Sequence, residues 1–298
     1  MTHKLTRAPA HRSFLIQTVF RADAQTPGEG VRGILIRGAV ALAACLPLSA
    51  QAHKQFLVPS ETVLSASGWI TVDAAVSNDL FYFNHQPMRL DNLKIIGPDG
   101  APVDAINPNT GTFRSTFDVN LATPGTYKLV LVNDALMATY ETESGERRRW
   151  RGTADTFKSE VPSNAKNLKV SQLQGRVETF VTSGKPNDTA LKPNGAGLEL
   201  VPVTHPNDLV AGEPVSFRFT LDGKPAAHLK VSVVPGASRY RNKQNEMELA
   251  TDKDGKLNIT WPEAGMYWLQ ASLEDERAAK PATSRRASYV ATFEVLPP

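Results

Sequence analysis

One histidine in this sequence stands where it can bind a metal ion through two nitrogens. His53 directly follows Ser49-Ala50-Gln51-Ala52, which ends in the A-x-A pattern of a secretory signal peptide. Cleavage after Ala52 gives His53 a free α-amine, and this amine and the ring Nδ1 can chelate one ion. Such nitrogen ligands suit copper, nickel, cobalt and zinc. The alternative is that cleavage must leave some residue first, and that this residue is a histidine by accident.

His85 is the first candidate for a further ligand. It lies in Asn84-His-Gln-Pro-Met88, in a turn or loop just after the aromatic run of residues 81–83. A histidine and a methionine three residues apart also suit a soft ion such as Cu(I). The structural alternative is that the His85 ring only caps or hydrogen-bonds this loop.

His205 is the second candidate. It precedes Pro206, which favours extended backbone at the entrance to the second predicted domain. Its alternative role is a hydrogen bond at the domain junction. We expect His228, in a predicted hairpin, to be solvated. The sequence therefore predicts a transition-metal site for Ni, Co or Cu formed by His53, His85 and His205.

The segment before His53 has the layout of an export signal. Two arginines precede an apolar stretch, Gly38–Leu48, that is too short to span a bilayer. Leu42-Ala-Ala-Cys45 also resembles a lipobox, so a lipoprotein anchored through Cys45 stays open as an alternative. We expect a leader with a signal peptide over residues 1–52 and a soluble periplasmic protein.

Composition narrows the classes of function. Residues 1–52 hold six of the 33 basic and two of the 30 acidic residues, which leaves 27 basic against 28 acidic residues in the remainder. The formal charge of +3 therefore comes from the leader, and nucleic-acid binding loses its main argument. The only cysteine, Cys45, also lies in the leader. Thiol nucleophiles, disulfides, iron–sulfur clusters and cysteine-based zinc sites are thus excluded after residue 52.

The rest of the chain has the pattern of strands joined by turns. Its 20 glycines and 21 prolines favour tight turns over long helices. We predict strands at 69–76, 112–119, 126–132, 168–181, 215–221, 229–234, 248–251, 257–260, 267–272 and 289–295. Short strands at this spacing point to β-sandwiches. A short helix is expected at Ala154–Glu160, before Pro162.

Two segments repeat one pattern. Ala122–Leu129 and Pro262–Leu269 each place a Pro/Gly turn before an aromatic residue that begins an apolar strand. This arrangement occurs where a late strand re-enters an immunoglobulin-like sandwich. We therefore predict an all-β protein with two such sandwich domains. The first covers residues 53–185 and includes a helical and basic insertion, and the second covers residues 186–298.

Several segments together resemble a known bacterial family. They are Ala52–Pro59, Asn78–His85, Pro98–Gly100, Arg176–Phe180, Leu200–Leu209, Ala211–Val215, Asp222–Pro225 and Thr251–Gly255. Their order makes the chain from His53 onward similar to the domain of unknown function 4198 family, whose members are often labelled periplasmic components of cobalt/nickel transport systems. The resemblance implies an exported protein with immunoglobulin-like or transthyretin-like β-sandwiches and, less directly, metal handling.

Two further segments have a chemical and a structural interpretation. Four arginines within residues 147–151 surround Trp150 and could bind an anion or an acidic partner, but we favour an edge strand protected by its charge. Asp252-Lys-Asp-Gly255 resembles a calcium loop without its third acidic position and its distant glutamate. A β-turn is expected there.

The sequence lacks the common catalytic motifs. It has no nucleophile elbow, phosphate-binding glycine loop, HExxH pair or dinucleotide fingerprint. We therefore expect a non-catalytic periplasmic protein that binds a transition-metal ion or its complex and delivers it to a membrane uptake transporter. One alternative is a metal-free scaffold or adhesion module that contacts an outer-membrane receptor or polymer. A lesser one is a copper oxygenase with a histidine brace, in which an N-terminal histidine on a β-sandwich chelates copper.

Overall fold

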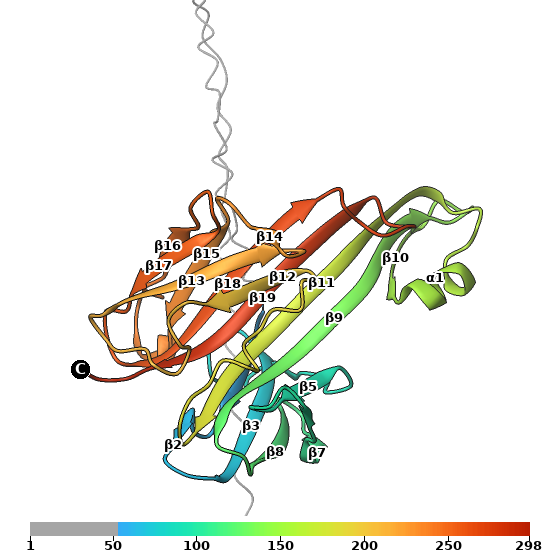
Figure 1. Cartoon of the computed structure of the whole chain (residues 1–298). Helices are drawn as coiled ribbons and strands as arrows, with labels where there is room; N and C mark the ends of the chain where they lie inside the picture. The colour runs from blue at the N-terminus through green and yellow to red at the C-terminus, as the bar shows by residue number, and fades with distance from the viewer. Residues whose placement is uncertain (1–52) are drawn as a thin grey trace, which may run out of the picture. The chain divides into compact units, whose positions relative to one another are not determined.

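The computed structural model describes residues 53–298, whose regular secondary structure is mostly β-strand (Figure 1). This range contains one α-helix, α1 (Ala154–Glu160), and one 3-10 turn, Ser238–Tyr240. No helix among the described residues is long and apolar enough to cross a membrane. The leader, its cleavage site and the lipobox lie outside the described residues and remain predictions.

The strands of residues 53–298 form three sheets. The N-terminal sheet contains β1 (Lys54–Pro59), β3 (Gly68–Ser77), β8 (Ser115–Leu121) and β7 (Ile106–Thr110) in this order, with β4 (Gln86–Pro87) paired to β3. The C-terminal sheet contains β12 (Leu198–Pro202), β13 (Pro214–Leu221) and β14 (Lys224–Pro225), with β17 (Lys256–Thr260) paired to β13.

The third sheet, here the long sheet, has ten strands. Its order is β16 (Met247–Ala250), β15 (Lys230–Pro235), β18 (Gly265–Asp275), β19 (Ser284–Val295), β11 (Lys166–Ser183), β9 (Gly125–Glu141), β5 (Leu93–Ile96) and β6 (Pro102–Val103). In addition, β10 (Arg147–Gly152) pairs with β9, and β2 (Val63–Leu64) pairs with β11. The pairing of β11 with β19 is parallel, and it joins strands from the two predicted domains.

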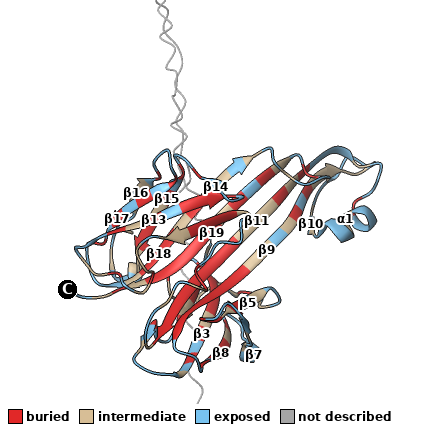
Figure 2. Cartoon of the chain, viewed as in Figure 1, coloured by how far each residue is buried: buried red, intermediate tan, exposed pale blue. Residues whose placement is uncertain are grey.

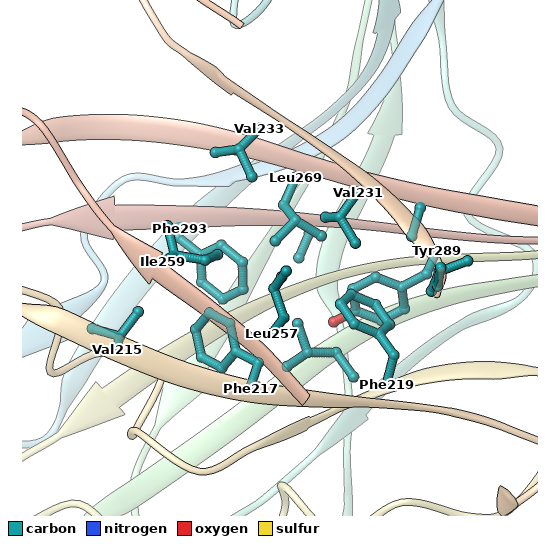
Figure 3. Close-up of a cluster of buried hydrophobic side chains, with 14 of the residues drawn as sticks. Val215, Phe217, Phe219, Val231, Val233, Leu257, Ile259, Leu269, Tyr289 and Phe293 are labelled. Atoms are coloured by element: carbon teal, nitrogen blue, oxygen red, sulfur yellow. The ribbon is translucent and has the colours of Figure 1, made fainter. Parts of the chain in front are cut away.

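The two faces of the long sheet belong to different hydrophobic cores. On β18, Tyr267 and Leu269 pack against the C-terminal sheet, whereas Trp268 between them packs in the core of the N-terminal sheet. The alternation arises because successive side chains of a strand point to opposite faces. Figure 2 shows the resulting burial along the central strands, and Figure 3 shows Phe217, Phe219 and other members of the C-terminal core. The fold is therefore all-β and sandwich-like, as predicted.

The predicted boundary between residues 185 and 186 remains a prediction. It falls just after β11, which ends at Ser183. Each predicted domain supplies a small sheet of its own, and both supply strands to the long sheet.

The repeat found in the sequence forms two equivalent tyrosine corners. The Tyr127 hydroxyl donates to the Thr123 carbonyl (2.7 Å) and accepts from the Thr123 amide (3.0 Å). The Tyr267 hydroxyl likewise donates to the Glu263 carbonyl (2.8 Å) and accepts from its amide (3.3 Å). The first residue of each strand is a glycine, Gly125 at φ 138° and Gly265 at φ 137°, in a backbone conformation that favours glycine. Each corner fixes the turn through which a strand enters its sandwich.

The predicted short helix is confirmed with its bounds. The Thr153 side chain accepts from the amide of Thr156, whose own side chain returns to the Thr153 backbone, and this capping box starts α1. Val161 is extended and ends the helix before Pro162, because a residue that precedes proline avoids helical backbone.

Removal of either corner hydroxyl is expected to destabilise the protein. Tyr127→Phe and Tyr267→Phe should each lower the free energy of unfolding by about 1–2 kcal/mol, because the turn loses both of its hydrogen bonds to the tyrosine hydroxyl. Urea unfolding followed by fluorescence measures the change. Tyr240→Phe is the matched control, since Tyr240 is 78% exposed, and it should change stability by less than about 0.5 kcal/mol. Wild-type midpoints for both corner variants would contradict this prediction.

Candidate functional site

The structure brings His53 and His85 together. Their ring centroids are 3.8 Å apart and the ring planes are inclined by 14°, so the imidazoles stack. His53 precedes β1 and His85 precedes β4, and the first residues of both strands pair with the end of β3: Lys54 with Ser77, and Gln86 with Val76. The two histidines thus meet across the end of one strand, although 32 positions separate them in the sequence.

The loop before His85 is held by its own hydrogen bonds. The Asn84 side chain donates to Asp79 (2.8 Å) and accepts from the Asn78 amide (3.1 Å), and the Asn84 amide donates to the Ser77 hydroxyl (3.3 Å). These contacts fix the backbone directly before His85.

The aromatic run in this loop anchors it to the N-terminal core. Phe81 packs edge-on against the fully buried Phe56 at 5.3 Å between ring centroids, and Phe83 lies 6.2 Å from the same ring. Phe81 has φ 62°, in the left-handed region that side chains with a Cβ rarely adopt. The position of His85 is therefore determined by both packing and hydrogen bonds.

The histidine pair is open to solvent, and its donors are imidazole nitrogens. His53 is exposed and His85 is partly exposed, so an ion can reach both rings. The described residues contain no cluster of three or more His, Cys, Asp or Glu side chains that could hold a metal. The pair itself offers two imidazoles, and the predicted cleavage after Ala52 would add the α-amine of His53 as a further nitrogen ligand. A nitrogen-only set favours copper or nickel over the oxygen-seeking calcium and magnesium.

Met88 does not join this pair. Its side chain is 5% exposed and packs in the core of the N-terminal sheet. The suggested His–Met pair for a soft ion is therefore wrong, because Met88 serves as a hydrophobic core residue.

His205 lies apart from the pair and has partners of its own. Its Nε2 is 2.9 Å from the Thr126 hydroxyl, and its Nδ1 accepts from the Asn207 amide at 3.2 Å. The Thr126 hydroxyl also forms a hydrogen bond with the hydroxyl of Thr182. The backbone amide of Thr182 donates to the carbonyl of Thr62, three residues after the end of β1. The six residues of β1, about 20 Å at the usual strand rise, separate this group from His53. Both ring nitrogens of His205 thus have hydrogen-bond partners within the protein.

Two other predicted features have the structural role that we favoured. β10 is an edge strand that pairs with β9 alone, and Arg148 forms a surface ion pair with Glu146 at 2.8 Å. At the second site, the Asp252 carboxylate accepts from the amides of Asp254 (2.9 Å) and Lys256 (2.8 Å), which closes a β-turn. His228 is exposed in its hairpin, as expected.

A group of buried charges was not expected from the sequence. Arg176, Glu178 and Glu199 are at most 7% exposed in their side chains and form two ion pairs, at 3.1 and 3.5 Å. Lys128, on the strand predicted at 126–132, is 6% exposed. A charged residue inside an otherwise apolar strand was the available signal, because such a side chain needs partners when buried.

Comparison with known proteins identifies the family but no activity. The family model described as "Domain of unknown function (DUF4198)" matches residues 50–275. No curated protein matches the chain.

Solved structures with some similarity include three proteins. The three N-terminal domains of the highly immunogenic outer capsid protein (Hoc) of bacteriophage RB49 are 13% identical, with a TM-score of 0.20 over 82% of this chain and 100% of that chain. The D0–D1 domain of intimin is 11% identical, with a TM-score of 0.20 over 80% and 96% of the chains. The adhesin InvE of Yersinia pseudotuberculosis is 13% identical, with a TM-score of 0.21 over 82% and 61%. TM-scores this low carry no argument about function.

The surroundings of His205 predict an acid-sensitive contribution to stability. Burial lowers the pKa of His205 below its ordinary value of 6.5, so the unfolded chain takes up this proton before the folded chain does. Stability should therefore fall as the pH drops below about 6.5, with a slope of up to about 1.4 kcal/mol per pH unit from one proton.

His205→Gln should reduce this slope, because glutamine does not titrate. Urea unfolding of the metal-free protein at pH 7.5, 6.5 and 5.5 measures the difference. His228→Gln, at an exposed histidine, should keep the wild-type slope. If His205→Gln also keeps it, the burial argument fails.

Proposed function

Since the chain belongs to the domain of unknown function 4198 family, whose description names no activity, we propose its function from the histidine pair: an exported, non-catalytic protein that binds a copper, nickel or cobalt ion through His53 and His85 and delivers it to a membrane uptake system. The observation that supports this proposal is the stacking of the two rings at 3.8 Å. Two rings in contact can present one nitrogen each to a single ion once their side chains rotate out of the stacked arrangement.

The two histidines have different roles in the proposed site. His53 supplies its α-amine and its ring, and His85 supplies a second imidazole from a loop that is already fixed. A bound ion offers Lewis acidity, but no group in this pair's surroundings is assigned to catalysis. His205 is left out of the ligand set because both of its ring nitrogens are engaged.

Metal titration of the protein that begins at His53 tests the site. Isothermal titration with Cu(II), Ni(II), Co(II) and Zn(II) should show one tight site, and His53→Ala or His85→Ala should weaken it at least tenfold. Binding should also weaken as the pH falls, since the ligands must be deprotonated.

Two further variants distinguish the contribution of the His53 α-amine from that of the imidazole rings. One extra alanine before His53 keeps both rings but removes the amine chelate, so it should weaken binding as His53→Ala does. His228→Ala removes an exposed histidine outside the pair and should bind as wild type. Equal affinity for wild type and His53→Ala would end the proposal. Reductant-dependent peroxide formation by the copper-loaded protein would instead favour the oxygenase and contradict a non-catalytic role.

The proposed export has its own test. Intact mass of the protein recovered from the periplasm is expected to correspond to a chain that begins at His53. A diacylglycerol adduct on Cys45 would show the lipoprotein and would contradict the free amine at His53.

A further inference from the structure

A cavity lies on the long sheet beside the segment that leads into the C-terminal sheet. Its volume is about 220 Å³, and residues 192–198 form one wall. Its floor is the face of β5, β9 and β11 that carries Lys128, Val130 and Arg176. This site is distinct from the histidine pair, since the two share no residue.

Three lysines surround one end of this cavity. Lys128 stands in the floor on β9, while Lys94 on the neighbouring β5 and Lys192 on the wall are exposed at the rim. Lys94 pairs in register with Val130, and Ile96 pairs with Lys128, so the two strands place charged and apolar side chains side by side.

Lys128 is buried without an ion-pair partner of its own. Its residue is 6% exposed, and its Nζ donates to the main-chain carbonyl of Lys192 at 3.2 Å. None of the ion pairs within residues 53–298 includes it. An ammonium group carries three donors, and burial of a charge without an opposite charge nearby is unfavourable.

The acidic groups near this end already have partners. Glu178 accepts from Arg176 and from the Tyr289 hydroxyl (2.8 Å), and Glu199 accepts from the amides of Asn194 (2.9 Å) and of the next residue (2.7 Å). One arginine and two glutamates carry one net negative charge. The three lysines against this charge leave a surplus of two positive charges at this end of the cavity.

The only acidic residue that lines the cavity is at its far end. Asp134 lies six residues beyond Lys128 on β9, about 20 Å away at the usual strand rise. Its carboxylate accepts from the side-chain amides of Gln172 (3.0 Å) and Gln174 (3.3 Å). Asp134 therefore cannot neutralise the lysines.

Between these two ends the β9 part of the floor is apolar, and Arg176 of β11, in register with Val132, is held by its two glutamates. Val130 is 2% exposed, yet it is not a member of any of the three hydrophobic cores of the described chain. Ile96 and Val132 line the cavity on either side of it and are partly exposed. A ligand that fits this cavity has an anionic head for the lysines and a short apolar stem for the valines.

We propose that this cavity binds a small organic anion, with a carboxylate or phosphate head between Lys94, Lys128 and Lys192 and an aliphatic stem over Val130. The head supplies the opposite charge that Lys128 lacks. The stem packs against the partly exposed side chains of Ile96 and Val132, which line the cavity on either side of Val130.

Isothermal titration with hexanoate, hexyl phosphate and uncharged hexanol tests the proposal. At equal ionic strength, at least one of the two anions should bind tenfold or more tightly than hexanol, and the comparison of the two shows which head is preferred. Lys128→Met keeps the aliphatic stem and should weaken anion binding at least tenfold. Lys256→Met, at an exposed lysine on β17, should bind as wild type.

The variants also keep this test independent of folding and of the metal proposal. If Lys128→Met does not fold, the double variant Lys94→Gln/Lys192→Gln at the exposed rim should show the same loss of affinity. His53→Ala should bind the anion as wild type. Anion binding no tighter than that of hexanol, or unchanged in the lysine variants, would overturn the proposal and leave Lys128 as a structural clamp on the Lys192 carbonyl.

Discussion

The parallel pairing of β11 with β19 is the contact on which the rest of the structure depends. It runs over nine residue pairs, from Ser171 opposite Ser284 to Thr179 opposite Thr292, and it makes one sheet from strands of both halves of the chain. A sheet covered on both faces must bury nearly every side chain of its central strands. Residues 176–183 are accordingly all buried, and their polar members need partners, as with the Thr179 hydroxyl on the Thr292 carbonyl (3.2 Å).

The two candidate sites lie where this double coverage ends. The N-terminal sheet covers one face, and the end of its β3 places His53 beside His85. The C-terminal sheet covers the opposite face only in part, and the cavity lies on the remaining surface of β5 and β9, where residues 192–198 form one wall. Each small sheet is shorter than the long sheet, and this difference in extent creates a rim on each face.

Local features of the fold could be predicted from the sequence, and pairings between distant segments could not. The tyrosine corners and α1 depend on residues within eight positions of one another, so their patterns are visible in the chain. The β11–β19 contact joins residues 113 positions apart, and no local pattern encodes it. β7 was missed because all five of its residues are exposed and show no alternation. The candidate site follows the same division: His53 was found from its place after the cleavage motif, whereas the partner of His205 is Thr126, 79 residues away.

The proposed metal site connects export with binding. In the precursor, the nitrogen of His53 belongs to a peptide bond with Ala52, and an amide nitrogen is a far poorer ligand than a free amine. The rings of His53 and His85 alone would offer two ligands in the precursor. In the proposed site, cleavage would add the third ligand without breaking a strand pairing, because the register of β1 begins at Lys54. A protein with this arrangement gains its full affinity only after removal of the leader, so the ion would be bound in the compartment to which the protein is exported.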